Sequence, residues 1–510
     1  MKTIAPLAAG LGLATGLGFQ PFGLWWATIL GFAGFVVLLN HIGPRRGFFL
    51  GYVYGLGFFA MTVSYVKNFG WWAPVLLVAF LALWGGLAGW ATTWTVTRGP
   101  GWLTRWYPIV AACAWTGTEW LAQRVPFGGF CWARFVYTVA DQPLGGLLPV
   151  LGAGGVSFLV ALTGSLVAML VTSPKLRQKA GALIIIVALL LTGGLLRLRP
   201  VPIGDATVSV GMIQGNVDST AGAFSMGYFR SVTAMHLSET IVALANWRIS
   251  GTPVPSMLTW PENSTDTDPT SDEATRDMVT QASNLAGVPM LIGIISLGPG
   301  DDERQTTALW WLPGEGPVAR VNKRNLAPFG ERVPMYSILR NLVPMTQMVG
   351  RQSVPGTGSG NIAATIGGRP VVIGDIICYE LAYDKTVYET VRGAGLITVQ
   401  SSNVSFIGTW QPEEQWAITR VRAMETRRWM VVTTTASLSG LIDPKGHVAD
   451  VSVPYTGTFR LYDVPLGSGV TPGMLIGPWL EGGVSLLAAL GVLLGLVRRI
   501  GLKRQQGAKS

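Results

Sequence analysis

The fold is decided by the stretch Val371–Val372–Ile373–Gly374–Asp375–Ile376–Ile377–Cys378–Tyr379–Glu380, an apolar, β-branched run that ends in a thiol and polar residues. A run of this kind predicts a buried strand. The strand would hold Cys378 rigidly at its tip, where the thiol can face a cleft. The other two cysteines, Cys113 and Cys131, lie in apolar stretches near the N-terminus. Cys378 thus has no evident disulfide or metal partner, which leaves two interpretations, a nucleophile or an inert core residue.

Other short apolar runs alternate with helical patterns between residues 205 and 465. Strands are expected at 206–213, 257–260, 288–296, 307–312, 370–377, 396–400 and 430–435, and helices at 230–247, 271–285 and 411–429. This alternation predicts one α/β domain of ordinary size.

The composition of the whole chain is that of an integral membrane protein. Of the 510 residues, 49% are hydrophobic and 13% charged, which excludes a disordered chain and an ordinary soluble protein. Eight apolar runs approach or reach the roughly 20 residues that cross a bilayer. The expected spans are 4–20, 23–40, 48–66, 71–96, 106–123, 145–172, 180–196 and 476–497. We therefore expect a membrane bundle of about seven helices (1–199), an α/β domain (200–470), and a C-terminal span with a basic tail (471–510).

The distribution of charge predicts how the chain is oriented. Segment 205–465 holds 19 Lys+Arg and 24 Asp+Glu, whereas the remainder holds 18 basic and 3 acidic residues. Basic residues that flank apolar runs follow membrane topology, and not the folded basic patch that nucleic-acid binding needs. With the N-terminus in the cytoplasm, 13 of those 18 basic residues are cytoplasmic. This arrangement places the α/β domain outside the cytoplasm and the C-terminus inside it.

Three polar motifs follow predicted strands: Leu258–Ser264, Val321–Glu331 and Cys378–Glu380. Taken singly, the first is explained as a solvated acid after a strand and the second as a surface charge pair. Together they supply a mechanism, because polar residues at strand ends are where α/β domains build their sites.

The residue types in these motifs can activate a thiol without histidine. Glu262 can take the proton of Cys378, and Lys323 can stabilise both the thiolate and the oxyanion of a tetrahedral intermediate. Glu331 can hold the lysine or the substrate in place. The three histidines of the chain are far apart and no Cys/His cluster has zinc spacing, so neither a metal site nor a cofactor is expected.

These motifs resemble those of the nitrilase superfamily of carbon–nitrogen hydrolases, with its Glu-Lys-Cys triad. Trp-Pro-Glu-Asn (260–263), Lys-x-x-Leu-x-Pro-Phe-Gly-Glu (323–331) and Cys-Tyr-Glu (378–380) occur in that order. With the N-terminal bundle and the C-terminal span, nearly the whole chain resembles the bacterial apolipoprotein N-acyltransferases. Gln20–Gly23 and Thr118–Leu121 are similar to landmarks of that family.

Two positions depart from the family pattern. Thr-Ala-Ser-Leu-Ser at 435–439, which contains Ala436, stands where the family often has Thr-Asn-Gly-Ile-Ser. Cys131 stands where the family has a proline. Cys131 lacks an acid–lysine context and is not expected to be catalytic.

The resemblance implies an α-β-β-α sandwich on a membrane bundle, and a two-step acyl transfer. Cys378 would be the nucleophile, Glu262 the general base and Lys323 the oxyanion stabiliser. The supporting residues would be Glu331, Tyr379 and Glu380. A membrane phospholipid would give its acyl chain to Cys378 as a thioester, and the α-amine of the lipidated N-terminal cysteine of an apolipoprotein would accept it.

The resemblance also implies the partners and the location. The donor is a phospholipid, the acceptor a diacylglyceryl-modified apolipoprotein, and no cofactor or nucleic acid takes part. The enzyme is expected in the bacterial cytoplasmic (inner) membrane as a monomer. Three alternatives stay open: a membrane-anchored nitrilase-like amidase with the same triad, a transporter with an outer α/β module, and a binding module with an inactive triad.

Two further groups of residues are singled out by their setting. Met335, Tyr336 and Leu339 follow Glu331 in an unusually apolar link, and are expected either to form a lid over lipid or to pack in the core. Glu119 is expected to pair with Arg124 or Arg134, either for structure or at a lipid headgroup.

Overall fold

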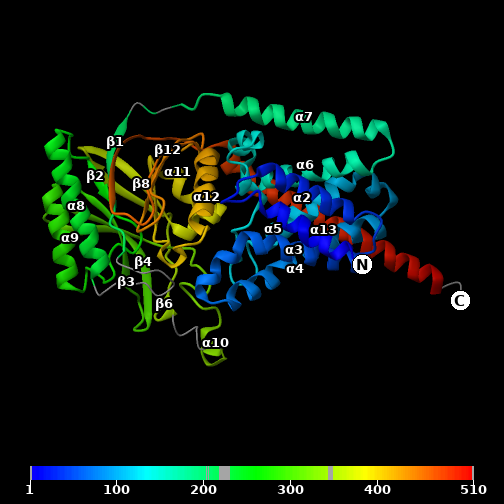
Figure 1. Cartoon of the computed structure of the whole chain (residues 1–510), viewed down its shortest axis with the longest axis horizontal. Coiled ribbons are helices and arrows are strands. Elements are labelled where there is room, and N and C mark those ends of the chain that lie inside the picture. The colour runs from blue at the N-terminus through cyan, green and yellow to red at the C-terminus, as the bar shows by residue number, and fades with distance from the viewer. Residues whose placement is uncertain (1–2, 203, 205, 218–229, 343–348, 508–510) are drawn as a thin grey trace. The chain divides into compact units, whose positions relative to one another are not determined.

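The computed structural model describes residues 3–202, 204, 206–217, 230–342 and 349–507, in two compact units (Figure 1). One unit contains Met1–Pro200 and Thr471–Ser510, and the other Val201–Val470.

The first unit is a bundle of apolar helices. Its helices are α1 (Ile4–Gly16), α2 (Trp25–Leu38), α3 (Pro44–Val63), α4 (Trp72–Arg98), α5 (Tyr107–Ala122), α6 (Leu148–Thr172), α7 (Leu176–Leu198) and α13 (Pro472–Gly507). The last helix, α13, packs against α4, α5 and α6, so the end of the chain lies beside helices from its beginning (Figure 1). Backbones approach closely where α3 meets α4, since a Cβ on Gly51 would lie 2.2 Å from the carbonyl oxygen of Gly85.

Five segments of the described residues are long and apolar enough to cross a membrane. They are Pro44–Phe69, Trp72–Arg98, Pro143–Thr172, Leu176–Leu198 and Pro472–Leu502. The first two apolar runs give shorter helices, because α1 ends at Gly16, before Gln20–Pro21, and α2 ends at Leu38. An apolar run in the sequence can therefore be longer than the helix that it forms.

The second unit contains two sheets. The first sheet has the order β13-β1-β2-β3-β4-β5, with β6 paired to β4, and the second has the order β12-β11-β10-β9-β8-β7. The first sheet consists of β1 (Thr207–Gln214), β2 (Met257–Thr259), β3 (Met290–Leu297), β4 (Glu303–Leu312), β5 (Gly316–Asn322), β6 (Gln352–Ser353) and β13 (Thr458–Pro465). The second consists of β7 (Asn361–Ile366), β8 (Arg369–Ile377), β9 (Leu396–Ser401), β10 (Met430–Thr434), β11 (Gly440–Ile442) and β12 (Val448–Val451).

The two sheets pack face to face, with helices on both outer sides. Val210 and Leu291 of the first sheet share one buried cluster with Ile373 and Val431 of the second. Helices α8 (Ser231–Ser250) and α9 (Glu273–Ala286) share a separate cluster with the other face of the first sheet. Helices α11 (Asp384–Gly393) and α12 (Gln411–Thr426) pack on the second sheet (Figure 1). This α-β-β-α order confirms the expected α/β architecture of the segment.

Candidate active site

The strand-to-turn junction after β8 positions Cys378. Ile377 ends the strand, and Cys378 begins the short 3₁₀ turn Cys378–Ala382 with a left-handed φ of 53°. A non-glycine residue in this region costs on the order of 1 kcal/mol, which the surrounding contacts must offset. The side chain is half-buried. The strand therefore holds the thiol in one orientation, as the sequence predicted.

Glu262 comes from the other sheet, three residues after the end of β2. Its side chain is 3% exposed. Its Oε1 accepts a hydrogen bond from Lys323 Nζ at 2.8 Å, and its Oε2 accepts one from the backbone N–H of Ser402 at 2.9 Å. The negative charge of Glu262 and the positive charge of Lys323 both act on the thiol of Cys378. Glu262 is thus fixed by a cation and an amide beside the thiol.

Lys323 follows β5 and lies between two carboxylates. Its side chain is 2% exposed, and its Nζ lies 2.8 Å from Glu262 Oε1 and 2.9 Å from Glu331 Oε1. Glu331 is held in turn, because its Oε2 accepts the backbone N–H of Ala327 at 2.7 Å. The three charges form one buried network, so the surface charge pair considered for Lys323 and Glu331 is wrong.

This network changes the proton affinity of the lysine and of the cysteine. Burial opposes the charge on Lys323, but the carboxylates of Glu262 and Glu331 outweigh it and raise the pKa of the ammonium well above its usual value. Burial of the Cys378 thiol, followed by the negative charge of Glu262, raises its pKa, and Lys323 opposes that shift. At neutral pH the lysine is therefore charged and the cysteine is a thiol.

Glu380 links the backbone beside Lys323 to the backbone beside Cys378. Its Oε1 accepts the N–H of Arg324 at 2.6 Å, and its Oε2 accepts the N–H of Ile377 at 2.9 Å. Burial raises the pKa of this carboxyl, although Arg324 opposes the shift. One side chain thus holds together segments from two different sheets.

The structure brings together five of the predicted site residues: Glu262, Lys323, Glu331, Cys378 and Glu380. Tyr379 is buried, and its ring lies 5.4 Å from that of Tyr383, edge to face. Met335 is 53% exposed, while Tyr336 and Leu339 are half-buried in the short helix α10 (Tyr336–Leu342). Within the described residues, no hydrogen bond or ion pair joins these last three to the triad.

Some residues that shape the site were not predicted from the sequence. Ser402 supplies a backbone donor to Glu262, and Arg324 packs beside Glu380, with its Nη2 2.6 Å from Thr390 Oγ1. Asp375, on the β8 face between Ile373 and Ile377, is 1% exposed. Burial, reinforced by Glu380 and Glu262, raises the pKa of Asp375 to about 8. A polar residue inside the apolar run of β8 was the available signal.

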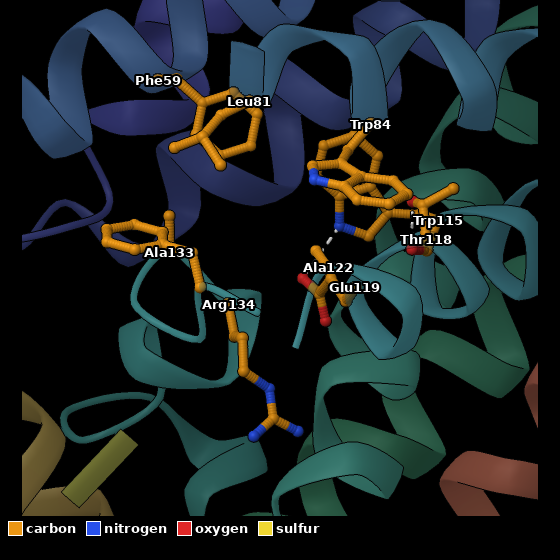
Figure 2. Close-up of a pocket in the computed structure, with 10 residues that line it drawn as sticks. Phe59, Leu81, Trp84, Trp115, Thr118, Glu119, Ala122, Ala133 and Arg134 are labelled. Carbon is orange, nitrogen blue, oxygen red and sulfur yellow. Dashed lines mark hydrogen bonds between the residues drawn. The ribbon is translucent and has the colours of Figure 1, made fainter. Parts of the chain in front are cut away.

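The bundle has a pocket of its own, formed by α3, α4, α5 and the segment that follows α5 (Figure 2). It is lined by Phe59, Leu81, Trp84, Trp115, Thr118, Glu119, Ala122, Phe130, Ala133 and Arg134. Glu119 accepts hydrogen bonds from Trp115 Nε1 and from the N–H of Phe135, both at 3.0 Å, whereas Arg134 pairs with Glu481 of α13 at 2.9 Å. Arg134 and Glu119 line the same pocket and interact electrostatically, and Glu481, far along the chain, is a further carboxylate partner of Arg134 that was not expected.

Comparison with protein families supports a full-length relationship to one group of enzymes. Residues 11–166 match the model of the apolipoprotein N-acyltransferase N-terminal domain. The apolipoprotein N-acyltransferase of Mycolicibacterium smegmatis is 30% identical over 96% of this chain and 85% of that protein. The protein of the same name from Chromobacterium violaceum is 30% identical over 97% of this chain and 94% of that protein.

Among solved structures, a mutant of an amidase of the nitrilase superfamily from Nesterenkonia AN1 is similar to part of the chain. The alignment has a TM-score of 0.38 and 14% identity, and it covers 54% of this chain and 96% of the amidase.

Proposed function

The chain belongs to the apolipoprotein N-acyltransferase family, and from that membership we propose how its own residues carry out the transfer. Cys378 is the nucleophile, Glu262 the general base and Lys323 the oxyanion stabiliser. Glu331 holds Lys323 in place, and Glu380 positions the backbone on both sides of the site. The donor is a membrane phospholipid, and the acceptor is a diacylglyceryl-modified apolipoprotein.

In the first half-reaction, the thiol of Cys378 attacks an ester carbonyl of the phospholipid. Glu262 takes the thiol proton while the carbon–sulfur bond forms, and the oxyanion is stabilised by the ammonium of Lys323. Collapse of the intermediate breaks the ester bond, and Glu262 returns the proton to the departing alcohol oxygen. The products are a lysophospholipid and a thioester on Cys378.

In the second half-reaction, the α-amine of the lipidated cysteine attacks the thioester. Glu262 accepts a proton from the amine, and Cys378 leaves as a thiol once it has received that proton. A new amide bond forms and the free enzyme is restored. The same carboxylate therefore serves both steps, and no metal or cofactor takes part.

The observation that carries this assignment is the position of Glu262 beside both Lys323 and Cys378. Its carboxylate accepts a hydrogen bond from the ammonium of Lys323 at 2.8 Å, and its charge acts on the thiol of Cys378. A base beside a nucleophile, with a cation for the developing charge, is the arrangement that acyl transfer through a covalent intermediate requires.

The test is intact mass analysis after incubation with phospholipid in the absence of acceptor. The wild type is expected to gain one acyl chain that neutral hydroxylamine removes, and Cys378→Ala is expected to gain none. Cys113→Ala, which alters a buried cysteine of the bundle, is the matched control and should behave as the wild type. An adduct on Cys378→Ala, or none on the wild type, would refute the assignment. An amidase would release free fatty acid instead of transferring it to an added lipopeptide.

The membrane arrangement completes the proposal. Residues 1–199 form a bundle, and together with residues 471–510 it crosses the bacterial inner membrane about eight times. Residues 200–470 form the catalytic domain on the extracytoplasmic face. The enzyme is a monomer. Both substrates carry acyl chains that lie in the bilayer, so a membrane-anchored enzyme meets them at the surface. A protease added to intact spheroplasts is expected to cleave the catalytic domain and to spare a tag on the cytoplasmic C-terminus.

Met335, Tyr336 and Leu339 form a lid over the donor acyl chain in this proposal. The exposed thioether of Met335 and the apolar neighbours in α10 suit an irregular acyl contact. The double variant Met335→Ser, Leu339→Ser is expected to lower turnover of phospholipid vesicles about tenfold without lowering the melting temperature. Unchanged turnover on vesicles would contradict the lid.

A further inference from the structure

The strand β12 forms an open edge of the second sheet. In the part of the chain that the structure describes, it pairs with β11 on one side and with no strand on the other. Val448 is 40% exposed, Val451 42% and Val453 65%. Tyr455 is exposed as well, so four large apolar side chains follow one another along this edge.

The edge strand β5 of the first sheet is protected in ways that β12 lacks. The edge strand β5 contains Pro317 and the exposed Arg320, which hinder pairing with another chain. The charged residue within β12, Asp450, is turned to the neighbouring strand β13. Its Oδ2 lies 3.1 Å from Arg460 Nε and 2.7 Å from the hydroxyl of Tyr462. No charge within β12 is therefore left to repel an added strand.

The hydrogen-bond pattern shows which backbone groups are open to a partner. Ser452 donates its N–H inward to the carbonyl oxygen of Ser439 at 2.7 Å. Successive residues of a strand present their polar groups to opposite sides, so the N–H and C=O of Val451 face the open side. An extended peptide could bond to these groups as an additional strand.

The carboxyl end of this edge is connected to the proposed active site. The N–H of Tyr455 bonds to the carbonyl oxygen of Ala436 at 3.0 Å, and the adjacent Thr435 donates its hydroxyl to the carbonyl oxygen of Glu262, also at 3.0 Å. The hydroxyl of Tyr455 accepts the N–H of Gly408 at 3.1 Å, in the loop that begins with the Glu262-binding Ser402. A peptide on the edge would thus have one end directed to the general base.

We propose that the β12 edge, defined as Val448–Val453, binds the polypeptide of the acceptor as an added antiparallel strand. The inference rests on the proposed active site, because the N-terminal cysteine of the acceptor must point to the Tyr455 end. The register shift opposite Leu441 and Ile442 leaves 450–453 as the regular part of this edge. Four positions at about 3.4 Å each span roughly 14 Å, so about four residues of the acceptor can pair. Main-chain hydrogen bonds do not depend on side chains, and the exposed valines add apolar contact. Such a surface accepts acceptors of different sequence.

The test compares two synthetic acceptors, diacylglyceryl-cysteine lipopeptides with one residue and with eight residues after the cysteine. The measured quantity is the ratio of kcat/KM for the long acceptor to kcat/KM for the short one. In the wild-type enzyme we expect a ratio of at least ten. Val451→Pro removes an outward N–H at an edge position that tolerates proline, and is expected to bring the ratio close to one. Val451→Thr keeps the N–H and is expected to keep the ratio.

A second measurement does not depend on a variant enzyme. N-methyl groups at alternate backbone positions of an eight-residue acceptor remove the N–H donors that would bond to the β12 edge. The wild type is expected to use such acceptors as poorly as the short acceptor. A wild-type ratio near one, or equal use of methylated and unmethylated peptides, would overturn the proposal. Failure of the proposed active site would be seen separately, as a missing thioester on Cys378.

Discussion

The acid Asp375 offers the sharpest test of how the site is built, through the substitution Asp375→Asn. Its carboxyl lies between the two sheets, where Thr398 Oγ1 donates to its Oδ1 at 2.6 Å. Its Oδ2 has no hydrogen-bond partner within the described residues. Asparagine has the same shape and keeps an acceptor for Thr398, but it cannot ionise. The substitution therefore removes the titration and leaves the packing almost unchanged.

The magnitude follows from the shift in pKa. The value rises from 3.8 to about 8 on folding, so the unfolded chain releases this proton more readily than the folded one. A raised folded-state pKa gives stability that is complete below pH 3.8 and is lost as the pH rises through 8. By pH 7 the loss is about 4 kcal/mol, at roughly 1.4 kcal/mol per pH unit. The Asp375→Asn variant does not lose this stability as the pH rises, because asparagine does not ionise. Its extra N–H lowers the free energy of unfolding by about 1–3 kcal/mol at every pH.

The assay is thermal unfolding of the purified protein in detergent, for the wild type and Asp375→Asn, between pH 4 and pH 9. The difference in Tm is expected to move in favour of the variant as the pH rises and to level off above pH 8. For a domain of this size each kcal/mol corresponds to about 2–4 °C, so the total change is on the order of 10 °C. Thr398→Val removes the donor to Asp375 but no titratable group. Its Tm difference from the wild type should therefore change much less with pH than the Tm difference of Asp375→Asn. A difference in Tm that stays constant from pH 4 to pH 9 would refute the reasoning.

Three further predictions concern the charges around the thiol and in the bundle. Glu262→Gln removes a negative charge that raises the pKa of Cys378, so the pH midpoint for alkylation of the thiol by iodoacetamide should move to lower pH while acyl transfer falls by about 10²–10⁴; an unmoved midpoint would count against the contact. Glu380→Gln leaves one of two backbone N–H groups without its acceptor and is expected to lower kcat about tenfold or more, with Glu380→Asp less affected. Glu481→Gln removes the carboxylate that pairs with Arg134 at 2.9 Å, and should lower stability by on the order of 3 kcal/mol, measured as Tm in detergent; an unchanged Tm would show that the pair is dispensable.

Glu262, Lys323 and Cys378 could be picked out from the sequence, and so could the strands that lead to Glu262 and Cys378, because local pattern and chemistry agreed. The apolar runs before Glu262 and Cys378 are short and β-branched, and each ends where a polar residue begins, so the strands β2 and β8 were predicted within two residues of their observed bounds. A short, β-branched apolar run that ends in polar residues is a clear sequence signal for a buried strand.

Other features depended on contacts that the sequence does not display. Several elements of this unit were not predicted, because their apolar patterns are too short or too polar to stand out from loops. They are the strands β5, β6, β7, β11, β12 and β13 and the helices α10 and α11. The same limit applies to Arg134, whose partner Glu481 is 347 residues away along the chain. Long-range pairing of this kind is set by the packing of helices that are far apart in sequence.

The balance of charge in the site explains why the predicted residues are arranged as they are. Lys323 lies between the carboxylates of Glu262 and Glu331, and the guanidinium of Arg304 also acts electrostatically on both carboxylates. Burial, followed by the charge of Glu262, raises the pKa of Cys378 even though Lys323 opposes the shift, so the thiol stays protonated. In the proposed mechanism the thiolate therefore forms only as Glu262 takes the proton, which places proton transfer and attack on the ester in the same step.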